Sequence, residues 1–189
     1  MTTLTIRGRA ETRGTRANGR AMTDPGQVSY ARAQRLAATF RDANVPKIAA
    51  ALEEAARDGH VDALFELGTW RHHGIGGARD DAAAVAAWAR AAQRGHVAAR
   101  IALANACERG VGMDRDAARA FSLYDRAAEA GDLGALYERG RCRYYGIGTP
   151  VSRDLAQNDF ARAARFGHAE AVCDAAEADT PRRMPRRDW

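Results

Sequence analysis

The stretch Ala63–Gly95, ALFELGTWRHHGIGGARDDAAAVAAWARAAQRG, decides the fold because its two glycine-containing runs recur at a fixed interval. The run Ala-Ala-x-x-Gly that ends it occurs four times, each copy 36 residues after the one before: Ala55–Gly59, Ala91–Gly95, Ala127–Gly131 and Ala163–Gly167. The run Gly-[Ile/Val]-Gly at its centre occurs three times at the same interval: Gly74–Gly76, Gly110–Gly112 and Gly146–Gly148. Two registers held over three periods indicate an array of structural repeats.

The composition favours helices with small side chains at their contacts. Hydrophobic residues make up 46% of the 189 residues, but only 7% of the chain is aromatic, and alanine dominates the rest. Alanine is the best helix former, whereas the β-branched residues that favour strands are scarce. No apolar run reaches the ~18–20 residues of a membrane span, which excludes a transmembrane protein. Three cysteines exclude a disulfide scaffold in which every thiol is paired within the chain.

The positive charge of the chain is concentrated in two terminal segments. Residues 1–23 carry a net charge of +4 and residues 180–189 carry +3, so residues 24–179 have −2 out of a total of +5. We expect both segments to be basic tails, the first of them disordered. Two readings of the first segment stay open: a transit peptide, or an upstream start with Met22 as the true initiator. Because residues 24–179 are close to neutral, nucleic-acid binding by the folded part of the chain is less favoured.

The same 36-residue register predicts where helices begin and end. Good N-cap residues recur at Asn44, Asp80, Asp116 and Ser152. They predict B helices at about 45–58, 81–94, 117–130 and 153–166, each ended by a glycine of the Ala-Ala-x-x-Gly run. A helices are predicted between those glycines and the Gly-x-Gly loops, at about 60–73, 96–109, 132–145 and 168–178. A first helix at 26–41, opening with Asp24-Pro25, would form a capping pair with 45–58.

The packing of these helices is also periodic. One large residue recurs in each B helix: Leu52, Trp88, Tyr124 and Phe160. Small residues recur in the A helices at Gly68, Ala104 and Gly140. Small positions let helices approach closely, and a large side chain fills the space between layers. A single helix pair cannot bury its apolar face, so the stability of the array comes from contacts between neighbouring repeats.

The periodic positions resemble the Sel1-like repeat, a relative of the tetratricopeptide repeat. The resemblance rests on Ala63, Leu67-Gly68, Gly74-x-Gly76, Asp80, Ala84, Trp88, Ala91-Ala92 and Gly95, and covers about residues 45–178. It implies an all-α, right-handed α-solenoid of antiparallel helix pairs, a tetratricopeptide-like superhelix. The expected organisation is a capping pair at 24–58, repeats at about 59–94, 95–130 and 131–166, and a final helix at 167–179. Such proteins serve as adaptors and scaffolds, often in bacterial signalling or envelope functions.

The third copy departs from the family pattern. The leucine found at Leu67 and Leu103 is Arg139, and the position of an expected aromatic residue holds Arg71, Cys107 and Arg143. The A helix of this copy is therefore unusually polar. Some bacterial relatives carry a disulfide in each repeat, but Cys107, Cys142 and Cys173 do not recur in register. We expect buried, inert thiols.

Two groups of histidines are candidates for metal binding or catalysis. His60, His96 and His168 recur at the same position of successive repeats, and Asp132 takes that position in the third. Zinc ligands must lie within ~2.1 Å of one ion, whereas neighbouring repeats are spaced at ~8–10 Å. We interpret these residues as polar helix starts. His72-His73 ends an A helix and belongs to no His-Glu-x-x-His motif. The Gly-x-Gly runs lack the strand and the Lys-Ser/Thr of a phosphate loop. No metal, cofactor or catalytic residue is expected.

A protein-binding surface is the remaining candidate site. In stacked helix pairs the A helices line the concave face, and the resemblance places nine residues there: Phe65, Thr69, His72, Ile101, Asn105, Glu108, Tyr137, Arg141 and Tyr144. An alternative reading assigns Phe65, Ile101 and Tyr137 to the core. The predicted function is a cytoplasmic adaptor that binds a protein or peptide, without a small-molecule cofactor. The alternatives are a binder of nucleic acid or anionic surfaces through the basic tails, and an enzyme such as a hydrolase.

Overall fold

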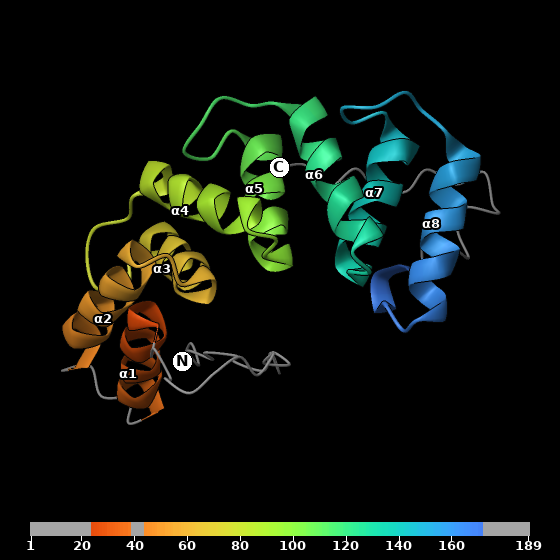
Figure 1. Cartoon of the computed structure of the whole chain (residues 1–189). Helices are drawn as coiled ribbons and strands as arrows, with labels where there is room; N and C mark the ends of the chain where they lie inside the picture. Colours follow the sequence, from red (N-terminus) through yellow and green to blue (C-terminus); the bar gives the residue numbers. More distant parts are fainter. Residues whose placement is uncertain (1–23, 39–43, 172–189) are drawn as a thin grey trace.

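A computed structural model describes residues 24–38 and 44–171 of the chain. The predicted basic tails, Cys173 and most of the predicted final helix lie outside the described residues. The described part is all-helical and contains eight helices, α1 (Pro25–Ala38), α2 (Val45–Arg57), α3 (Val61–His73), α4 (Asp81–Gln93), α5 (Val97–Arg109), α6 (Ala117–Glu129), α7 (Leu133–Tyr145) and α8 (Arg153–Arg165). Each helix packs against the next, and the pairs follow an arc (Figure 1). The predicted α-solenoid of consecutive helix pairs is confirmed.

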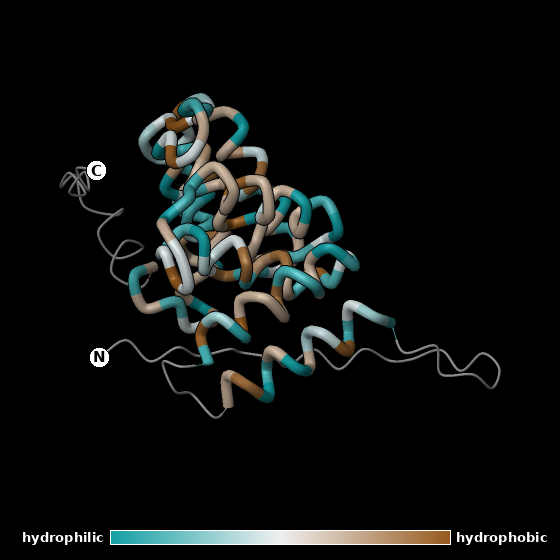
Figure 2. Tube along the Cα trace, turned by 90° about the vertical axis from the view of Figure 1, so that its left-hand side faces the viewer, coloured by the Kyte–Doolittle hydropathy of each residue, from teal (hydrophilic) through white to brown (hydrophobic). Residues whose placement is uncertain are grey.

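The predicted helix boundaries from α2 onwards hold to within one residue. The first helix was predicted at 26–41 and is described over Pro25–Ala38. Asp24 caps it as expected, since its Oδ1 accepts a hydrogen bond from the Gly26 N–H at 3.1 Å. Apolar and hydrophilic residues alternate along the helices in the way expected of helices with one buried face (Figure 2).

The B-helix caps agree only in part with the prediction. Asp80 and Asp116 accept hydrogen bonds from the N–H groups of Ala83 and Arg119, at 2.8 and 2.9 Å. Asn44 and Ser152 stand at the predicted N-cap positions, but their side chains make no capping hydrogen bond. The backbone of Asn44 is already helical, which turns its side chain away from the cap position.

The small and large positions interlock as the repeat pattern predicts. A methyl group on Gly68 would lie 2.6 Å from the indole of Trp88, and one on Gly140 would lie 2.8 Å from the ring of Phe160. In the middle copy Ala104 takes the place of these glycines and Tyr124 provides the ring, with both fully buried. The closeness of each helix pair therefore depends on a side chain of one carbon or none.

The loop glycines join one repeat to the previous one. Gly112 and Gly148 have φ of +69° and +67°, a conformation that favours glycine. A methyl group on Gly112 would collide with the carbonyl oxygen of Asp81, and one on Gly148 with that of Ala117. Asp81 and Ala117 each begin the B helix of the preceding repeat. In these two loops the second glycine is thus a backbone contact between successive repeats, whereas Gly76 faces side chains of α2.

The third repeat buries ions at its helix contacts. Arg139 on α7 donates to Asp159 on α8 through Nε at 3.0 Å and a terminal nitrogen at 2.5 Å, and to Asp125 on α6 at 2.9 Å. Arg143 donates to the second oxygen of Asp159 at 2.7 Å. The polar A helix noted in the sequence therefore carries cations whose charges are neutralised by two aspartates of the neighbouring B helices.

Candidate functional site

The candidate site is the set of nine residues predicted on the concave face. They lie on the three A helices of the repeats: Phe65, Thr69 and His72 on α3, Ile101, Asn105 and Glu108 on α5, and Tyr137, Arg141 and Tyr144 on α7. The surroundings of the residues on α3 and α5 differ from those of the residues on α7. Five of the first six line one pocket, whereas the α7 residues and Glu108 contact other side chains of the chain.

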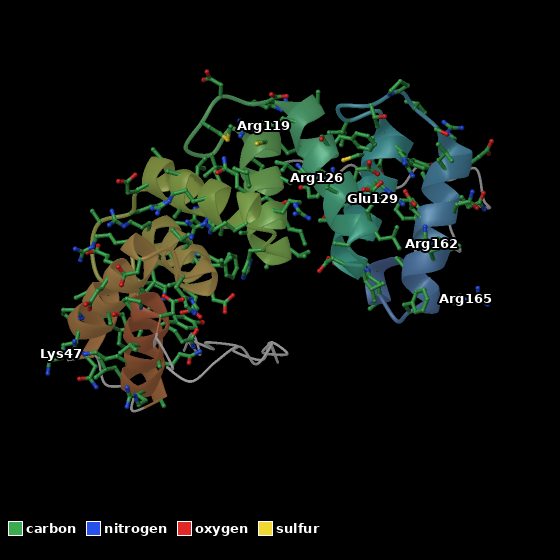
Figure 3. All side chains as sticks on the ribbon, viewed as in Figure 1. Lys47, Arg119, Arg126, Glu129, Arg162 and Arg165 are labelled. Carbon is green, nitrogen blue, oxygen red and sulfur yellow. The ribbon has the colours of Figure 1, made fainter. Side chains whose placement is uncertain are left out.

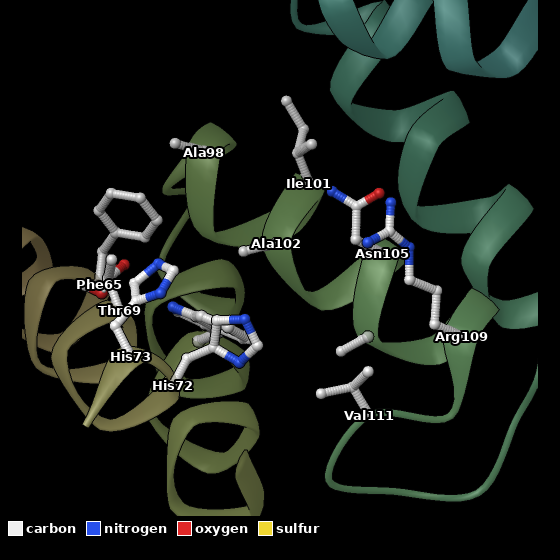
Figure 4. A pocket seen from close by; sticks show the side chains of 12 residues that line it. Phe65, Thr69, His72, His73, Ala98, Ile101, Ala102, Asn105, Arg109 and Val111 are labelled. Atoms are coloured by element: carbon white, nitrogen blue, oxygen red, sulfur yellow. Dashed lines mark hydrogen bonds between the residues drawn. The ribbon is translucent and has the colours of Figure 1, made fainter. Parts of the chain in front are cut away.

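The pocket lies between α3 and α5 and has a volume of about 360 Å³ (Figure 4). Twelve residues line it: Phe65, Thr69, His72, His73, Trp88, Ala98, Ile101, Ala102, Asn105, Ala106, Arg109 and Val111. Its size falls in the range of natural ligand pockets, ~300–1,000 Å³. None of the twelve residues is acidic, and seven of them are apolar. We name this site the α3–α5 pocket.

Asn105 is the polar group held most firmly in the α3–α5 pocket. Its Oδ1 accepts a hydrogen bond of 2.7 Å from the hydroxyl of Tyr124, a fully buried side chain of α6. The same hydroxyl lies 3.1 Å from Oε2 of Glu108, so its single hydrogen serves two acceptors. The amide nitrogen of Asn105, Nδ2, carries two N–H donors. Within the described residues Nδ2 has no hydrogen-bond partner, and it lies on the pocket side of α5 beside Ile101 (Figure 4).

His72 occupies the opposite wall of the pocket. Its Nδ1 lies 2.7 Å from Oδ1 of Asp81, the first residue of α4, and its ring packs 5.5 Å from that of Trp88. Asp81 also accepts two hydrogen bonds of 3.0 Å from Arg79. The Arg79 hydrogen bond holds the pKa of Asp81 below its usual range. Asp81 is thus an ionised carboxylate whose charge is balanced by its neighbours.

The α7 residues and Glu108 are engaged within the chain. Arg141 donates to both oxygens of the buried Glu108, at 2.7 and 2.6 Å, and to Glu138 at 2.6 Å. Tyr137 is 7% exposed and stacks on His168 at 4.9 Å. Tyr144 is half-buried beside Tyr145 and below the guanidinium of Arg153. A partner-binding role for these four residues stays a prediction.

Seven pocket residues were not among the nine: His73, Trp88, Ala98, Ala102, Ala106, Arg109 and Val111. Part of the signal was present in the sequence. Ala98, Ala102 and Arg109 lie three or four residues from Ile101 or Asn105, the spacing of one helix face. Trp88 and Val111 come from α4 and from the Gly-Val-Gly loop, and only the fold brings them to the same place.

The histidines in register are helix caps, as interpreted from the sequence. The Nδ1 atoms of His60, His96 and His168 accept hydrogen bonds from N–H groups three residues later, and Asp132 does the same through Oδ1. Burial lowers the pKa of His60 and of His96, which favours the neutral ring that a cap requires. His96 also stacks on Phe65 of the preceding A helix at 4.7 Å.

The cysteines and histidines of the described part form no catalytic pair. Cys107 and Cys142 are free and buried, and burial raises the pKa of Cys142 to about 12. Among the described residues, neither His72 nor His73 hydrogen-bonds to a serine or a cysteine. In the same part of the chain no three His, Cys, Asp or Glu side chains are grouped to hold a metal ion. None of the described helices is long and apolar enough to cross a bilayer.

Comparison with known proteins places the chain in a family. The Sel1 repeat model matches residues 61–96, 97–132 and 134–167, more than half of the chain. Similar solved structures include a Sel1 repeat protein from Oxalobacter formigenes, with a TM-score of 0.77, 24% identity, and coverage of 82% of this chain and 66% of that one. Another is c5321, a protective antigen of uropathogenic Escherichia coli strains with an SLR fold, with a TM-score of 0.76, 21% identity, and coverage of 82% and 33%.

These structures share the fold, and this chain spans about a third of the Escherichia coli antigen and just under two thirds of the Oxalobacter protein. Among curated proteins none matches at a significant level. Sel1 repeats are generally protein-interaction modules. On the evidence of its three matched repeats, its helix pairs and its solenoid arrangement, the chain belongs to the Sel1 repeat family.

Proposed function

We propose that the chain is an adaptor that binds a protein or peptide segment on the concave face of its A helices. The observation that supports this function is the α3–α5 pocket, built from two successive repeats. A pocket with an apolar wall and a few placed polar groups is the usual form of a binding site. The predicted residues Phe65, Thr69, His72, Ile101 and Asn105 all line it.

A pocket-filling variant tests this function. Ala98 lines the pocket, is exposed and makes no side-chain hydrogen bond, so Ala98→Tyr should fill the pocket without removing a core contact. The matched control is Ala161→Tyr at an exposed position on α8. The tagged full chain and both variants are used to capture partners from the source cell, with quantification by mass spectrometry.

We expect Ala98→Tyr to reduce capture of the specific partner at least tenfold, while Ala161→Tyr leaves it unchanged. The helical circular dichroism of all three proteins should be the same. Equal capture by the unmodified chain and Ala98→Tyr would show that this part of the concave face does not bind the partner. Equal loss in both variants would indicate a general effect of the added ring.

A further inference from the structure

The wall of the α3–α5 pocket that α3 forms presents hydrogen-bond acceptors. The hydroxyl of Thr69 donates its hydrogen to the carbonyl of Phe65 at 3.0 Å, so its oxygen is left as an acceptor. Nδ1 of His72 lies 2.7 Å from the ionised carboxylate of Asp81, which can only accept, so Nδ1 carries the ring hydrogen. In the neutral ring Nε2 is therefore an acceptor, and within the described residues it has no hydrogen-bond partner.

The opposite wall, formed by α5, presents donors. Nδ2 of Asn105 carries two N–H groups that have no partner among the described residues, and it lies on the pocket side beside Ile101 (Figure 4). Arg109 also lines this wall, but it already interacts within the chain. Exposed cations such as Arg126 and Arg162 lie on α6 and α8 and do not line the pocket (Figure 3). The donors that this wall offers a ligand are therefore those of an uncharged amide.

The space between these polar groups is bounded by apolar side chains. Phe65 and Ile101 present aromatic and aliphatic surface, and Ala98 and Ala102 leave room beside them. An aliphatic side chain together with its flanking peptide units fits a volume of about 360 Å³. The pocket therefore combines an acceptor wall, a donor wall and an apolar space between them.

A trans peptide unit matches this combination. The unit is planar, and its C=O and N–H point in opposite directions. A unit that lies across the pocket can direct its C=O to Asn105 and its N–H to His72, so each wall pairs with one polar group. A carboxylate, which only accepts, or an ammonium group, which only donates, would be complementary to one wall and not to the other. The main-chain groups of a helix are already paired with each other, so the peptide unit must belong to an extended segment.

We propose that the α3–α5 pocket binds the main chain of an extended polypeptide segment through one peptide unit, beside an uncharged aliphatic side chain. Nδ2 of Asn105 donates to the carbonyl of that unit, and Nε2 of His72 accepts from its N–H. The aliphatic side chain lies against Phe65 and Ile101. This inference rests on the proposed function and adds to it the chemistry of the segment that is recognised.

Two small molecules of nearly the same shape test the role of the N–H group. N-acetyl-leucine N-methylamide, the diamide, has an aliphatic side chain between two peptide units. Its diester analogue replaces both N–H groups by oxygen and keeps both carbonyls. Each is titrated into the isotopically labelled full chain at pH 8, where unperturbed histidine side chains are neutral, and followed by NMR. We expect the diamide to bind at least fivefold more tightly and to shift the side-chain amide signals of Asn105 and the ring signals of His72.

Variants of the two walls assign the hydrogen bonds to residues. His72→Phe keeps an aromatic ring and removes Nε2, so it should reduce the preference for the diamide to less than twofold. Asn105→Leu removes the Nδ2 donors while Tyr124 keeps Glu108 as an acceptor, so it should weaken binding of both molecules at least fivefold. The matched control Asn158→Leu, at an exposed position on α8, should bind both like the unmodified chain. Circular dichroism checks that each variant is folded, and the comparison of the two molecules on the unmodified chain needs no variant.

A third compound separates a main-chain amide from a side-chain amide. It is the diester with the side chain of glutamine in place of that of leucine, so its N–H groups lie on the side chain alone. Binding of this compound as tight as that of the diamide would overturn the inference and assign the pocket to an amide side chain.

The inference would also be overturned by equal binding of the diamide and the diester, by shifts confined to residues outside the pocket, or by no binding of any compound. A full preference for the diamide in His72→Phe, or an effect of Asn158→Leu as large as that of Asn105→Leu, would overturn it as well. In each of these cases the capture experiment with Ala98→Tyr decides the proposed function independently.

Discussion

The second and third repeats place different chemistry at the same positions of the same fold. In the second repeat α5 and α6 carry Leu103 and Leu123, which belong to one apolar core cluster. In the third repeat, 36 residues later, α7 and α8 carry Arg139 and Asp159, joined by two hydrogen bonds. Leu103 is 3% exposed and its counterpart Arg139 is 8% exposed, so both are buried. Leu123 is only partly buried, whereas its counterpart Asp159 is 2% exposed, so the third repeat buries a charge more deeply than the second buries a leucine.

The contrast extends to a second pair of positions. Arg143 and Asp125 interact at 3.8 Å in the third repeat, and Arg71 and Glu53 form the equivalent pair at 2.8 Å in the first. In the second repeat the same two positions hold Cys107 and Ala89. The backbone contacts between repeats therefore tolerate an apolar or an ionic pair. An ion pair must recover the cost of removing two charges from water, and it does so only when both partners are present.

The largest expected loss of stability comes from removing one partner of the Arg139–Asp159 ion pair in the third repeat. Arg139→Leu leaves Asp159 buried with Arg143 as its remaining cation, which should cost about 3 kcal/mol of unfolding free energy. Urea denaturation followed by circular dichroism measures this loss, and hydrogen exchange should localise it to α7 and α8. A loss below about 1 kcal/mol would mean that Arg143 alone neutralises the aspartate.

The next largest loss of stability is expected at Gly140 in the third repeat. A methyl group on Gly140 meets the Phe160 ring at 2.8 Å, so Gly140→Ala should destabilise by about 2 kcal/mol despite the better helix propensity of alanine. In the second repeat Ala104→Gly should cost about 1 kcal/mol through backbone entropy. Thermal denaturation of both variants gives the comparison. A stabilised Gly140→Ala variant would contradict the tight packing of α7 on α8.

Transplanting the second repeat's chemistry into the third should have a smaller effect. The double variant Arg139→Leu with Asp159→Leu restores an apolar pair and leaves Arg143 with Asp125. Its stability should lie within about 1 kcal/mol of the unmodified chain, because a buried ion pair and a packed apolar pair are often equivalent. A double variant as unstable as the sum of the two single variants would show that these positions do not act as a pair.

The smallest effect concerns the helix caps, where the second repeat begins with His96 and the third with Asp132. Burial lowers the pKa of folded His96 below its ordinary value of 6.5, so the unfolded chain binds more protons in the window just below pH 6.5. Stability contributed by neutral His96 is therefore complete above pH 6.5 and is lost as the pH falls through that window. His96→Asn keeps a capping oxygen and should flatten the decrease between pH 7 and 5 by about 0.5 kcal/mol.

The control for this last change is Asp132→His, which should steepen the same decrease. Both variants are compared by denaturation at pH 5, 6, 7 and 8. Glu66 adds an opposite trend, because burial raises its pKa to about 7, and its contribution to stability falls as the pH rises from about 4.5 to 7. Equal pH profiles for the unmodified chain and His96→Asn would mean that the His96 cap does not titrate with unfolding.

The fold could be predicted from the sequence because its evidence is periodic. The glycines and the B-helix aspartates recur at 36 residues, and local capping rules convert them into helix ends. The two N-cap residues without a side-chain capping bond, Asn44 and Ser152, begin the first and the last of the four B helices. The ion pairs could not be predicted, because Arg139 and Asp159 lie 20 residues apart on different helices and meet only after the helices pack.

The residues of the candidate site also differ in how far the sequence predicts their surroundings. Phe65, Ile101 and Asn105 follow from the family resemblance and line one pocket. The resemblance also places Arg141 on the concave face, but its side chain is 13% exposed and bound to Glu108. The side chain of an arginine can reach several partners, so its engagement depends on residues that sequence spacing does not bring together.

The contacts of Gly112 and Gly148 with the preceding B helix have a consequence for how such arrays change in length. Because each contact is made by backbone atoms, it does not depend on which side chains a copy carries, and a whole unit of 36 residues can be duplicated or deleted with every junction preserved. An insertion of any other length within a unit would separate the loop from its neighbour. The surface chemistry of each copy can therefore diversify freely while the step from one copy to the next stays constant.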